Sequence, residues 1–312
     1  MNCELETLVE TLQRDGAAIL PGYLEEIADE IEPGIWDFLE GITANWETPI
    51  DRNNEKTWNE FYNLYPKHGM LLQQWQAGHA NICWDIRQNM KVLNVFSTIW
   101  NCEIEDLLVS FDGLSMHLPP EKTKRRFNQK EWLHCDQSFR DSNFKCVQSW
   151  VNGSETNEND ATLMFLKGSH LLHSEFAKKL DKPTAADWYK FTDSELELYK
   201  ECEKVRVACP KGSLVLWDSR TVHCGAEPLR RTEPRIRSVI YLCYLPRSHA
   251  TEANLRKKIK AFEDQRTTSH WPNKPKLFPL KPRTYGNPVP VCLPVQRKEI
   301  KLKFLAGYSN SN

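Results

Sequence analysis

Apolar residues recur at helical spacing near the start of the chain. In segment 4–14 they occupy Leu5, Leu8, Val9 and Leu12, which lie on one face of a helix. This pattern predicts an amphipathic helix packed on a sheet. Related patterns predict further helices at 23–45, 84–100, 174–205 and 249–266. The segment 174–205 would bridge the two halves of a barrel, and the helix at 249–266 would be basic.

Strand patterns follow in the second half of the chain. Residues 210–223 open with a Pro-Lys-Gly turn, continue with the β-favouring run Ser-Leu-Val-Leu-Trp, and lead through a short polar link into His223. After a loop, residues 235–244 are again rich in β-branched and aromatic side chains. These segments predict a mainly β core with flanking helices.

The motif Trp-Leu-His134-Cys-Asp136-Gln-Ser offers two metal ligands. Successive side chains of a strand point to opposite faces, so His134 and Asp136 project to the same side while Cys135 points away. A His-x-Asp pair alone is weak evidence, but His223 supplies a third ligand directly after a strand-like segment. Two imidazoles and one carboxylate can occupy one face of an octahedral Fe(II) and leave the other positions open. The three residues predict a non-haem iron oxygenase.

Two arginines open the strand that follows. Arg235 and Arg237 lie on one face of it, because they are two residues apart. A fixed guanidinium near the metal would suit a dicarboxylate cosubstrate, since its planar fork binds a carboxylate through two hydrogen bonds. The alternative is an edge strand whose charged residues prevent aggregation.

Five motifs make the chain similar to the phytanoyl-CoA dioxygenase-like (PhyH) branch of the Fe(II)- and 2-oxoglutarate-dependent oxygenases. They occur in the order found in that family, cover roughly residues 105–246, and are preceded by a weaker match at residues 12–24. The motifs are Trp-Leu-His134-Cys-Asp136-Gln-Ser, Val-Gln-Ser-Trp150-Val, Leu-Met-Phe-Leu-Lys-Gly-Ser-His170, Lys-Gly-Ser-Leu-Val-Leu-Trp-Asp-Ser-Arg-Thr-Val-His223, and Arg237-Ser-Val-Ile-Tyr-Leu-Cys-Tyr.

The resemblance implies a double-stranded β-helix, of the jelly-roll or cupin-like type, with Fe(II), 2-oxoglutarate and O2 as cofactors. It implies that Arg237 binds the distal carboxylate of 2-oxoglutarate, with Arg235, two residues earlier on the same face, as the alternative. It also implies that the iron ligands are His134, Asp136 and His223, and that Trp150 and Met116 line the cosubstrate pocket.

Several of these residues have a structural alternative. A Trp and a Met in apolar strands are commonly core residues. His170 matches a motif that serves as a structural turn near the site, and we do not expect it to bind metal. The residues after His223 lack a hydroxyl that some relatives offer to the cosubstrate, so Thr221 or Ser238 would have to replace it.

The expected reaction is hydroxylation of an unactivated C–H bond in a small polar or amino-acid-like metabolite, with release of succinate and CO2. The presence of Asp136 favours hydroxylation over halogenation, because loss of this carboxylate would open a position for halide. Two alternatives remain at this stage. One is an oxygenase that acts on a protein or nucleic acid, supported by the basic cluster at 256–260, and the other is a catalytically silent jelly-roll binding protein.

Composition is consistent with an intracellular enzyme. The formal net charge is −1, from 41 basic and 42 acidic residues, which does not predict nucleic acid or an anionic membrane as an obligate partner. Ten cysteines without CxxC pairs predict reduced thiols in the cytoplasm. Cys135 and Cys224 adjoin ligands but should face away from them and pack. No apolar run approaches the roughly 20 residues of a membrane span.

The 312 residues fit one domain of three parts. Residues 1–104 would form N-terminal additions and a lid, 105–246 the core with its insert at 174–205, and 247–312 a basic helix and a Pro/Lys-rich arm. The arm would either lie at the mouth of the site or wrap the barrel and bury Trp271, Phe278 and Tyr285. Aromatic and polar residues of 45–80 would either form the lid or fill the core; they are Trp46, Trp58, Phe61, Tyr62, Tyr65, His68, Gln73, Gln74, Trp75 and His79.

Overall fold

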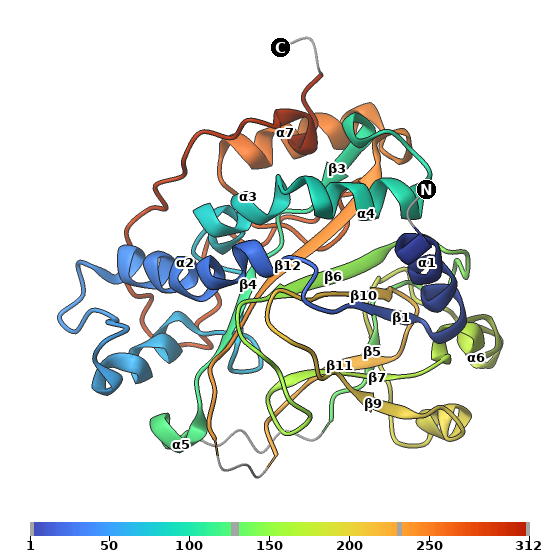
Figure 1. The fold of residues 1–312 in the computed structure, drawn as a ribbon, viewed down its shortest axis with the longest axis horizontal. Coiled ribbons are helices and arrows are strands. Elements are labelled where there is room, and N and C mark those ends of the chain that lie inside the picture. The colour runs from blue at the N-terminus through green and yellow to red at the C-terminus, as the bar shows by residue number, and fades with distance from the viewer. Residues whose placement is uncertain (1–2, 126–130, 230–232, 310–312) are drawn as a thin grey trace.

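Two antiparallel sheets form the centre of the molecule in the computed structural model, which describes residues 3–125, 131–229 and 233–309. The larger sheet has the strand order β1-β10-β6-β12-β4-β2, with β3 also paired to β12. The long strand β12 pairs with β3, β4 and β6 and so joins the two halves of this sheet (Figure 1). Its strands are β1 (Ala17–Leu20), β2 (Leu71–Leu72), β3 (Leu107–Val109), β4 (Leu114–His117), β6 (Val147–Asn152), β10 (Leu214–Asp218) and β12 (Arg237–Pro246).

The smaller sheet has the order β8-β5-β11-β7-β9. Apolar side chains from both sheets meet in one cluster that includes Trp150, Trp217 and Phe165, so the sheets are packed face to face. This arrangement, with helices around it, confirms the predicted mainly β, double-stranded β-helix class. The strands of the smaller sheet are β5 (His134–Cys135), β7 (Thr162–Leu166), β8 (Tyr189–Lys190), β9 (Lys204–Arg206) and β11 (His223–Ala226).

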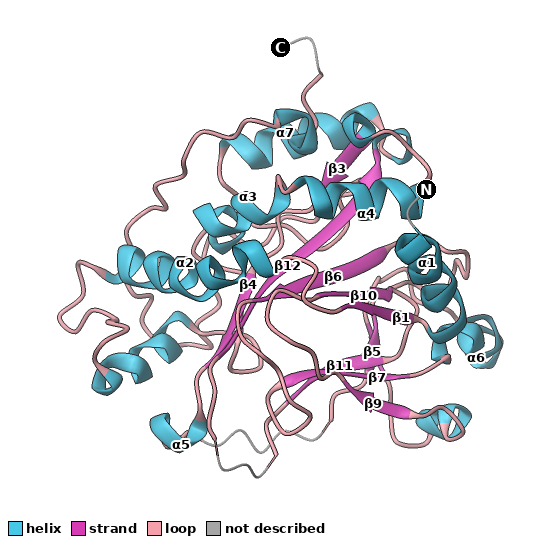
Figure 2. Ribbon diagram, viewed as in Figure 1, coloured by secondary structure: helices cyan, strands magenta, loops and turns pink. Residues whose placement is uncertain are grey.

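Helices cover the outer face of the larger sheet, where α2, α3 and α4 pack against β12 (Figure 2). Within the described ranges, no helix combines the length and apolar character that crossing a bilayer requires. The α-helices are α1 (Cys3–Asp15), α2 (Glu25–Thr43), α3 (Asn81–Arg87), α4 (Met90–Trp100), α5 (Pro120–Thr123), α6 (His173–Lys179) and α7 (Glu252–Glu263), and the 3-10 helices are η1 (Glu55–Leu64), η2 (Ala77–His79), η3 (Ile104–Asp106), η4 (Ser169–Leu172), η5 (Glu195–Tyr199), η6 (Arg247–His249) and η7 (Lys303–Ala306).

Two predicted helices are divided. The segment 84–100 contains the end of α3 and all of α4. The two helices separate where Asn89 caps the start of α4 by accepting a hydrogen bond from the Lys91 amide at 2.9 Å. The prediction for 174–205 is wrong over most of its length. Only α6 and η5 are helical there, because Pro183 cannot continue a helix, and β8 and β9 extend the smaller sheet on either side.

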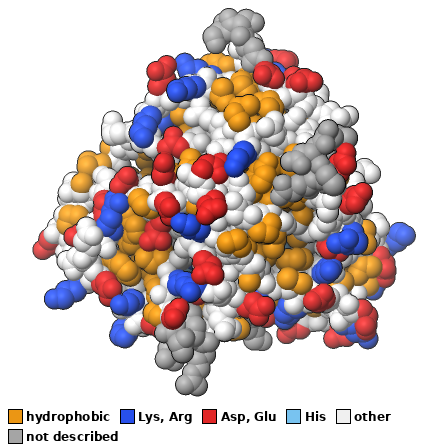
Figure 3. All heavy atoms as spheres, viewed as in Figure 1, with side chains coloured by type: hydrophobic (Ala, Val, Ile, Leu, Met, Phe, Trp, Pro, Cys, Tyr) orange, Lys and Arg blue, Asp and Glu red, His pale blue; other side chains and the backbone are white. Residues whose placement is uncertain are grey.

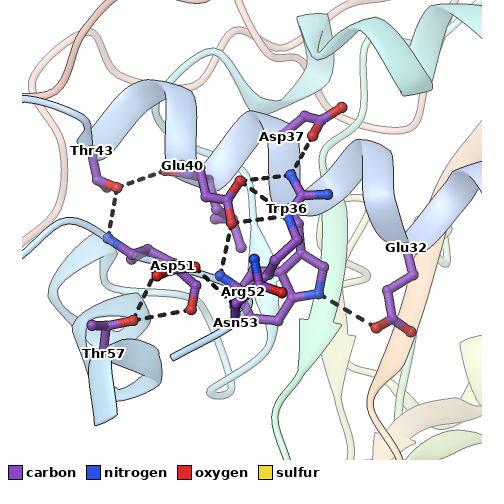
Figure 4. A network of polar contacts seen from close by, with 11 residues as sticks. Glu32, Trp36, Asp37, Glu40, Thr43, Asp51, Arg52, Asn53 and Thr57 are labelled. Atoms are coloured by element: carbon purple, nitrogen blue, oxygen red, sulfur yellow. Dashed lines mark hydrogen bonds and ion pairs between the residues drawn. The ribbon is translucent and has the colours of Figure 1, made fainter. Parts of the chain in front are cut away.

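The segment after α2 is fastened to that helix. Arg52 binds Glu40 through Nε at 2.9 Å and through Nη2 at 2.6 Å, and it also contacts Asp37 (Figure 4). The Thr43 hydroxyl accepts a hydrogen bond from the Ile50 amide at 3.1 Å. Part of 45–80 therefore belongs to the core rather than to a lid. Of the ten residues named for the lid, four are buried: Trp58, Phe61, Tyr62 and His79.

The chain after α7 crosses the surface almost wholly as loop, with η7 near its end (Figure 2). Trp271 is buried against Cys146, Cys243 and Leu245, as the wrapping interpretation predicts. Phe278 is half-buried. The prediction for Tyr285 is wrong: it is 80% exposed, in a turn where its φ is 52°.

Candidate metal and cosubstrate site

The structure brings His134, Asp136 and His223 together. β5 and β11 are antiparallel neighbours in which His223 is the direct partner of His134, and their rings lie 4.3 Å apart between centroids. Asp136 follows β5, where its amide donates to the Ser219 carbonyl at 2.9 Å. Its Oδ2 lies 3.6 Å from His134 Nε2 and 3.4 Å from His223 Nε2. The three ligand atoms are all within 4.8 Å of one another, which suits a shared metal ion.

Backbone carbonyls fix the orientation of both imidazoles. His134 Nδ1 donates to the Trp132 carbonyl at 3.1 Å, and His223 Nδ1 donates to the Thr221 carbonyl at 2.8 Å. A carbonyl only accepts, so each Nδ1 carries the proton and each Nε2 keeps its lone pair. In both rings the metal-binding nitrogen therefore faces Asp136.

The electrostatic setting favours the protonation states that a metal requires. Burial lowers the pKa of His134, as does the adjacent His223, which keeps the imidazole neutral. Burial alone would raise the pKa of Asp136, but interactions with His134 and His223 hold it well below its usual range. The Gln148 amide from β6 also donates to Asp136 Oδ2 at 3.0 Å. Two imidazoles and an ionised carboxylate fit Fe(II).

Arg237 is a buried cation, only 5% exposed, at the start of β12. Its Nη1 lies 3.3 Å from the Ser115 hydroxyl and 3.8 Å from Met70 Sδ, and its guanidinium lies 5.6 Å from the centre of the Trp150 ring. No carboxylate pairs with it among the described residues, and its Nε has no hydrogen-bond partner there. An isolated buried guanidinium is costly, so this position fits a bound anion such as the distal carboxylate of 2-oxoglutarate.

Arg235 has a different environment. Its guanidinium nitrogens lie 3.3 Å from Glu155, 3.8 Å from Asp160 and 3.2 Å from Glu233. Three carboxylates already surround it at the surface. Of the two arginines, only Arg237 has the burial and the missing partner that a cosubstrate contact requires.

The register of the larger sheet separates Trp150 from Met116. Arg237 is paired with His117, and Ser238 with Met116, so Met116 lies on the opposite face from Arg237. Met116 is fully buried in the core beneath the helices. The prediction that Met116 lines the cosubstrate pocket is therefore corrected, whereas Trp150 does lie beside Arg237. The neighbouring Ser115, which we did not predict, provides the contact from β4.

The two hydroxyls suggested for the cosubstrate are placed elsewhere. Thr221 donates to the Gly16 carbonyl at 2.8 Å, and Ser238 shares the outward face of Met116. His170 Nε2 donates to the Gln13 carbonyl at 2.8 Å, in agreement with a structural role. Cys135 and Cys224 pack in the cluster on the outer face of the smaller sheet, as predicted.

A stack of rings continues outward from His134. Trp132 lies parallel to it at 4.4 Å, and His68 lies on the other side of Trp132 at 3.7 Å. The Trp132 indole N–H donates to the Gly225 carbonyl at 3.0 Å, which joins the stack to β11. One signal in the sequence could have indicated this arrangement: Trp132 lies two residues before His134, so the two side chains project to the same side of an extended segment.

The C-terminal arm reaches the same region, as the mouth interpretation predicts. His270 Nε2 lies 3.3 Å from the Asp136 carbonyl, and Lys274 pairs with Asp187 at 2.9 Å. Trp188, which follows Asp187 in the sequence, is 45% exposed, and its ring lies 6.0 Å from that of His134. The arm therefore borders the open side of the site.

The comparisons with known proteins agree with this geometry. The sequence model of the family described as phytanoyl-CoA dioxygenase (PhyH) matches residues 12–235, a range that contains His134, Asp136 and His223. The chain is similar to "Ava biosynthesis cluster protein O" of Aspergillus versicolor, with 29% identity over 242 residues that cover 74% of this chain and 75% of that protein.

Solved structures are similar at lower identity. EctD from S. alaskensis in its apoform has 14% identity and a TM-score of 0.49, over 81% of this chain and 79% of that one. The epimerase SnoN in complex with Fe3+, alpha ketoglutarate and nogalamycin RO has 17% identity and a TM-score of 0.48, over 78% and 84% of the two chains.

Proposed function

Because the chain belongs to the phytanoyl-CoA dioxygenase family of Fe(II)- and 2-oxoglutarate-dependent oxygenases, we propose that it hydroxylates a small polar or amino-acid-like metabolite. His134, Asp136 and His223 hold the iron in this proposal. The observation that carries it is the convergence of their three ligand atoms, with both Nε2 lone pairs directed toward Asp136.

Iron, 2-oxoglutarate and O2, when bound, supply the oxidation of a C–H bond, with succinate and CO2 as the other products. The protein contributes position and charge. Asp136 supplies one negative charge to the metal, and Gln148 fixes the orientation of this carboxylate. Arg237 binds the distal carboxylate of 2-oxoglutarate, and Ser115 holds its guanidinium from the side. The presence of Asp136 as a third ligand supports hydroxylation rather than halogenation.

Surface charge supports a small substrate over a nucleic acid. Basic and acidic side chains are interspersed on the face shown in Figure 3, without a single-sign stripe. The basic cluster of α7 at 256–260 also presents less free positive charge at the surface than its sequence suggests. Lys258 is buried, with its amine donating to the Val109 carbonyl, and Lys260 pairs with Asp264 at 2.7 Å. Only part of the cluster remains for a phosphate backbone.

The test is turnover by protein purified without oxygen and then supplied with Fe(II), 2-oxoglutarate and O2. We expect succinate to form slowly without substrate, and faster when an extract contains the substrate, with a product 16 mass units heavier. We also expect 2-oxoglutarate with iron to raise the melting temperature. A thermal shift without succinate from any extract indicates a binding protein. The absence of both contradicts the proposal.

A further inference from the structure

One tight turn, residues 67–71, contacts three parts of the site. The backbones of Lys67 and Leu71 are joined by two hydrogen bonds of 2.8 and 2.9 Å, and His68 and Gly69 have φ values of 52° and 72°. The Met70 carbonyl accepts from the Met116 amide at 3.0 Å, which fastens the turn to β4. The turn therefore presents its side chains in fixed positions.

The side chains of this turn contact different parts of the site. Met70 lies against Arg237 in the cosubstrate region, and His68 stacks on Trp132 beside the metal ligands. Lys67 lies furthest out, with its amine 5.7 Å from the centre of the Trp188 ring. Trp188 in turn borders His134. Lys67 and Trp188 thus face each other next to the metal ligands.

Lys67 has no anionic partner within the part of the chain that the structure describes. The nearest acidic residue on the Trp188 segment, Asp187, is occupied by Lys274. Burial lowers the pKa of Lys67, while Asp136 opposes this effect and Arg283 adds to it, so both charges lie within electrostatic reach of the amine. Arg283 is held there by Gln74, whose side chain bonds both its backbone amide and its carbonyl. Its guanidinium likewise forms no ion pair among the described residues.

We propose that the substrate carries a carboxylate that binds Lys67, with Arg283 as a second cation nearby, and a flat apolar part that lies on Trp188. This inference rests on the proposed function and specifies its substrate class. Lys67 and Arg283 are both exposed, so their charged groups are accessible to a negatively charged ligand, and charge-assisted hydrogen bonds are stronger than neutral ones. A half-exposed indole offers a flat face for an apolar group. The Trp188 ring borders the ligand His134 and the Lys67 amine lies over that ring, so a molecule held by both lies beside the metal ligands.

The test uses the full-length protein, loaded anaerobically with Fe(II) and saturating 2-oxoglutarate, and two calorimetric probes. N-acetyl-L-tryptophan carries a carboxylate and an indole, and N-acetyl-L-tryptophanamide differs only in lacking the charge. We expect the acid to bind about tenfold more tightly than the amide, as for one charge-assisted hydrogen bond. Lys67→Met should remove this preference, Lys67→Arg should retain it, and Trp188→Ala should weaken both probes. Lys257→Met, a surface lysine of α7, is the matched control and should behave as the native protein.

Equal binding of the two probes, or binding of neither, overturns the proposal, as does a preference that survives in Lys67→Met. A loss of 2-oxoglutarate affinity in Lys67→Met also overturns it, because Lys67 would then serve the cosubstrate. The thermal shift with iron and 2-oxoglutarate is measured on the same samples. If that shift is absent from the native protein, the proposed function fails, whatever the probes show.

Discussion

The indole of Trp132 lies face to face with the imidazole of His134, 4.4 Å away and within 6° of parallel, and donates its N–H to the strand that carries His223. One side chain thus restrains both histidines. Groups that orient metal ligands commonly contribute tenfold to a hundredfold to metal affinity. The stack is therefore expected to influence metal binding without touching the metal.

Replacing Trp132 tests this relationship. We expect Trp132→Leu to weaken Co(II) or Fe(II) binding by about tenfold or more, measured by competition with a chelator, and Trp132→Phe to have a smaller effect because it keeps a ring for stacking. Trp46→Leu is a control, since Trp46 bonds the Val291 carbonyl far along the C-terminal arm. Native metal affinity in Trp132→Leu would show that the stack is only packing.

The ligand assignment predicts different results for two histidines. Metal at about 100 times its Kd should stabilise the native protein by about 2.7 kcal/mol, a rise of several degrees in Tm. His223→Ala should abolish this rise. His170→Ala should lower the Tm without metal, because it removes the bond to Gln13, but should keep the metal-dependent rise. A normal rise in His223→Ala would refute the assignment.

Replacing Arg237 and replacing Arg235 should change the requirement for 2-oxoglutarate differently. Arg237→Ala should raise the 2-oxoglutarate concentration for half-maximal thermal shift by tenfold or more, because it removes a charge-assisted contact of about 1.5–3 kcal/mol. Arg235→Ala should leave that concentration unchanged, since Arg235 is paired with surface carboxylates. The reverse pattern would assign the cosubstrate to Arg235.

Lys258 predicts a pH-dependent stability. Burial lowers its pKa from 10.5 to about 7, so between these values the unfolded chain binds the proton and the folded chain does not. Stability from this group therefore rises with pH across that window, by at most about 1.4 kcal/mol per pH unit. Relative to Lys258→Met, the native protein should gain stability in urea unfolding between pH 7 and pH 10. A constant difference between the two proteins would contradict the lowered pKa.

Local periodicity predicted the parts of the site that depend on one strand. His134 and Asp136 share a side because strand side chains alternate, and Arg237 opens a strand with the expected composition. Met116 was misplaced because its face depends on the register between β4 and β12, where a shift of one residue exchanges the two sides. Ser115 was missed for the same reason.

Features formed by long-range contacts could not be predicted from the sequence. The aromatic residues after α2 have the composition of a binding surface, but Arg52 fastens their segment to the helix and most of them join the core. Tyr285 is an aromatic residue of an arm that was expected to pack on the barrel, yet its turn directs the side chain outward. In both cases the burial of the side chain depends on whether residues far away in the sequence pack against it.

The turn at 67–71 connects the choice of substrate to the affinity for cosubstrate. Lys67 and Met70 are fixed by the same two backbone hydrogen bonds, so a change that moves one moves the other against Arg237. Changes that shift the backbone of this turn are consequently pleiotropic: a new specificity obtained by rebuilding the turn would be accompanied by altered 2-oxoglutarate binding, whereas a side-chain replacement such as Lys67→Met keeps both backbone bonds. Trp188 has no contact with Arg237 among the described residues, and substitutions at that position offer a route by which specificity can diverge alone.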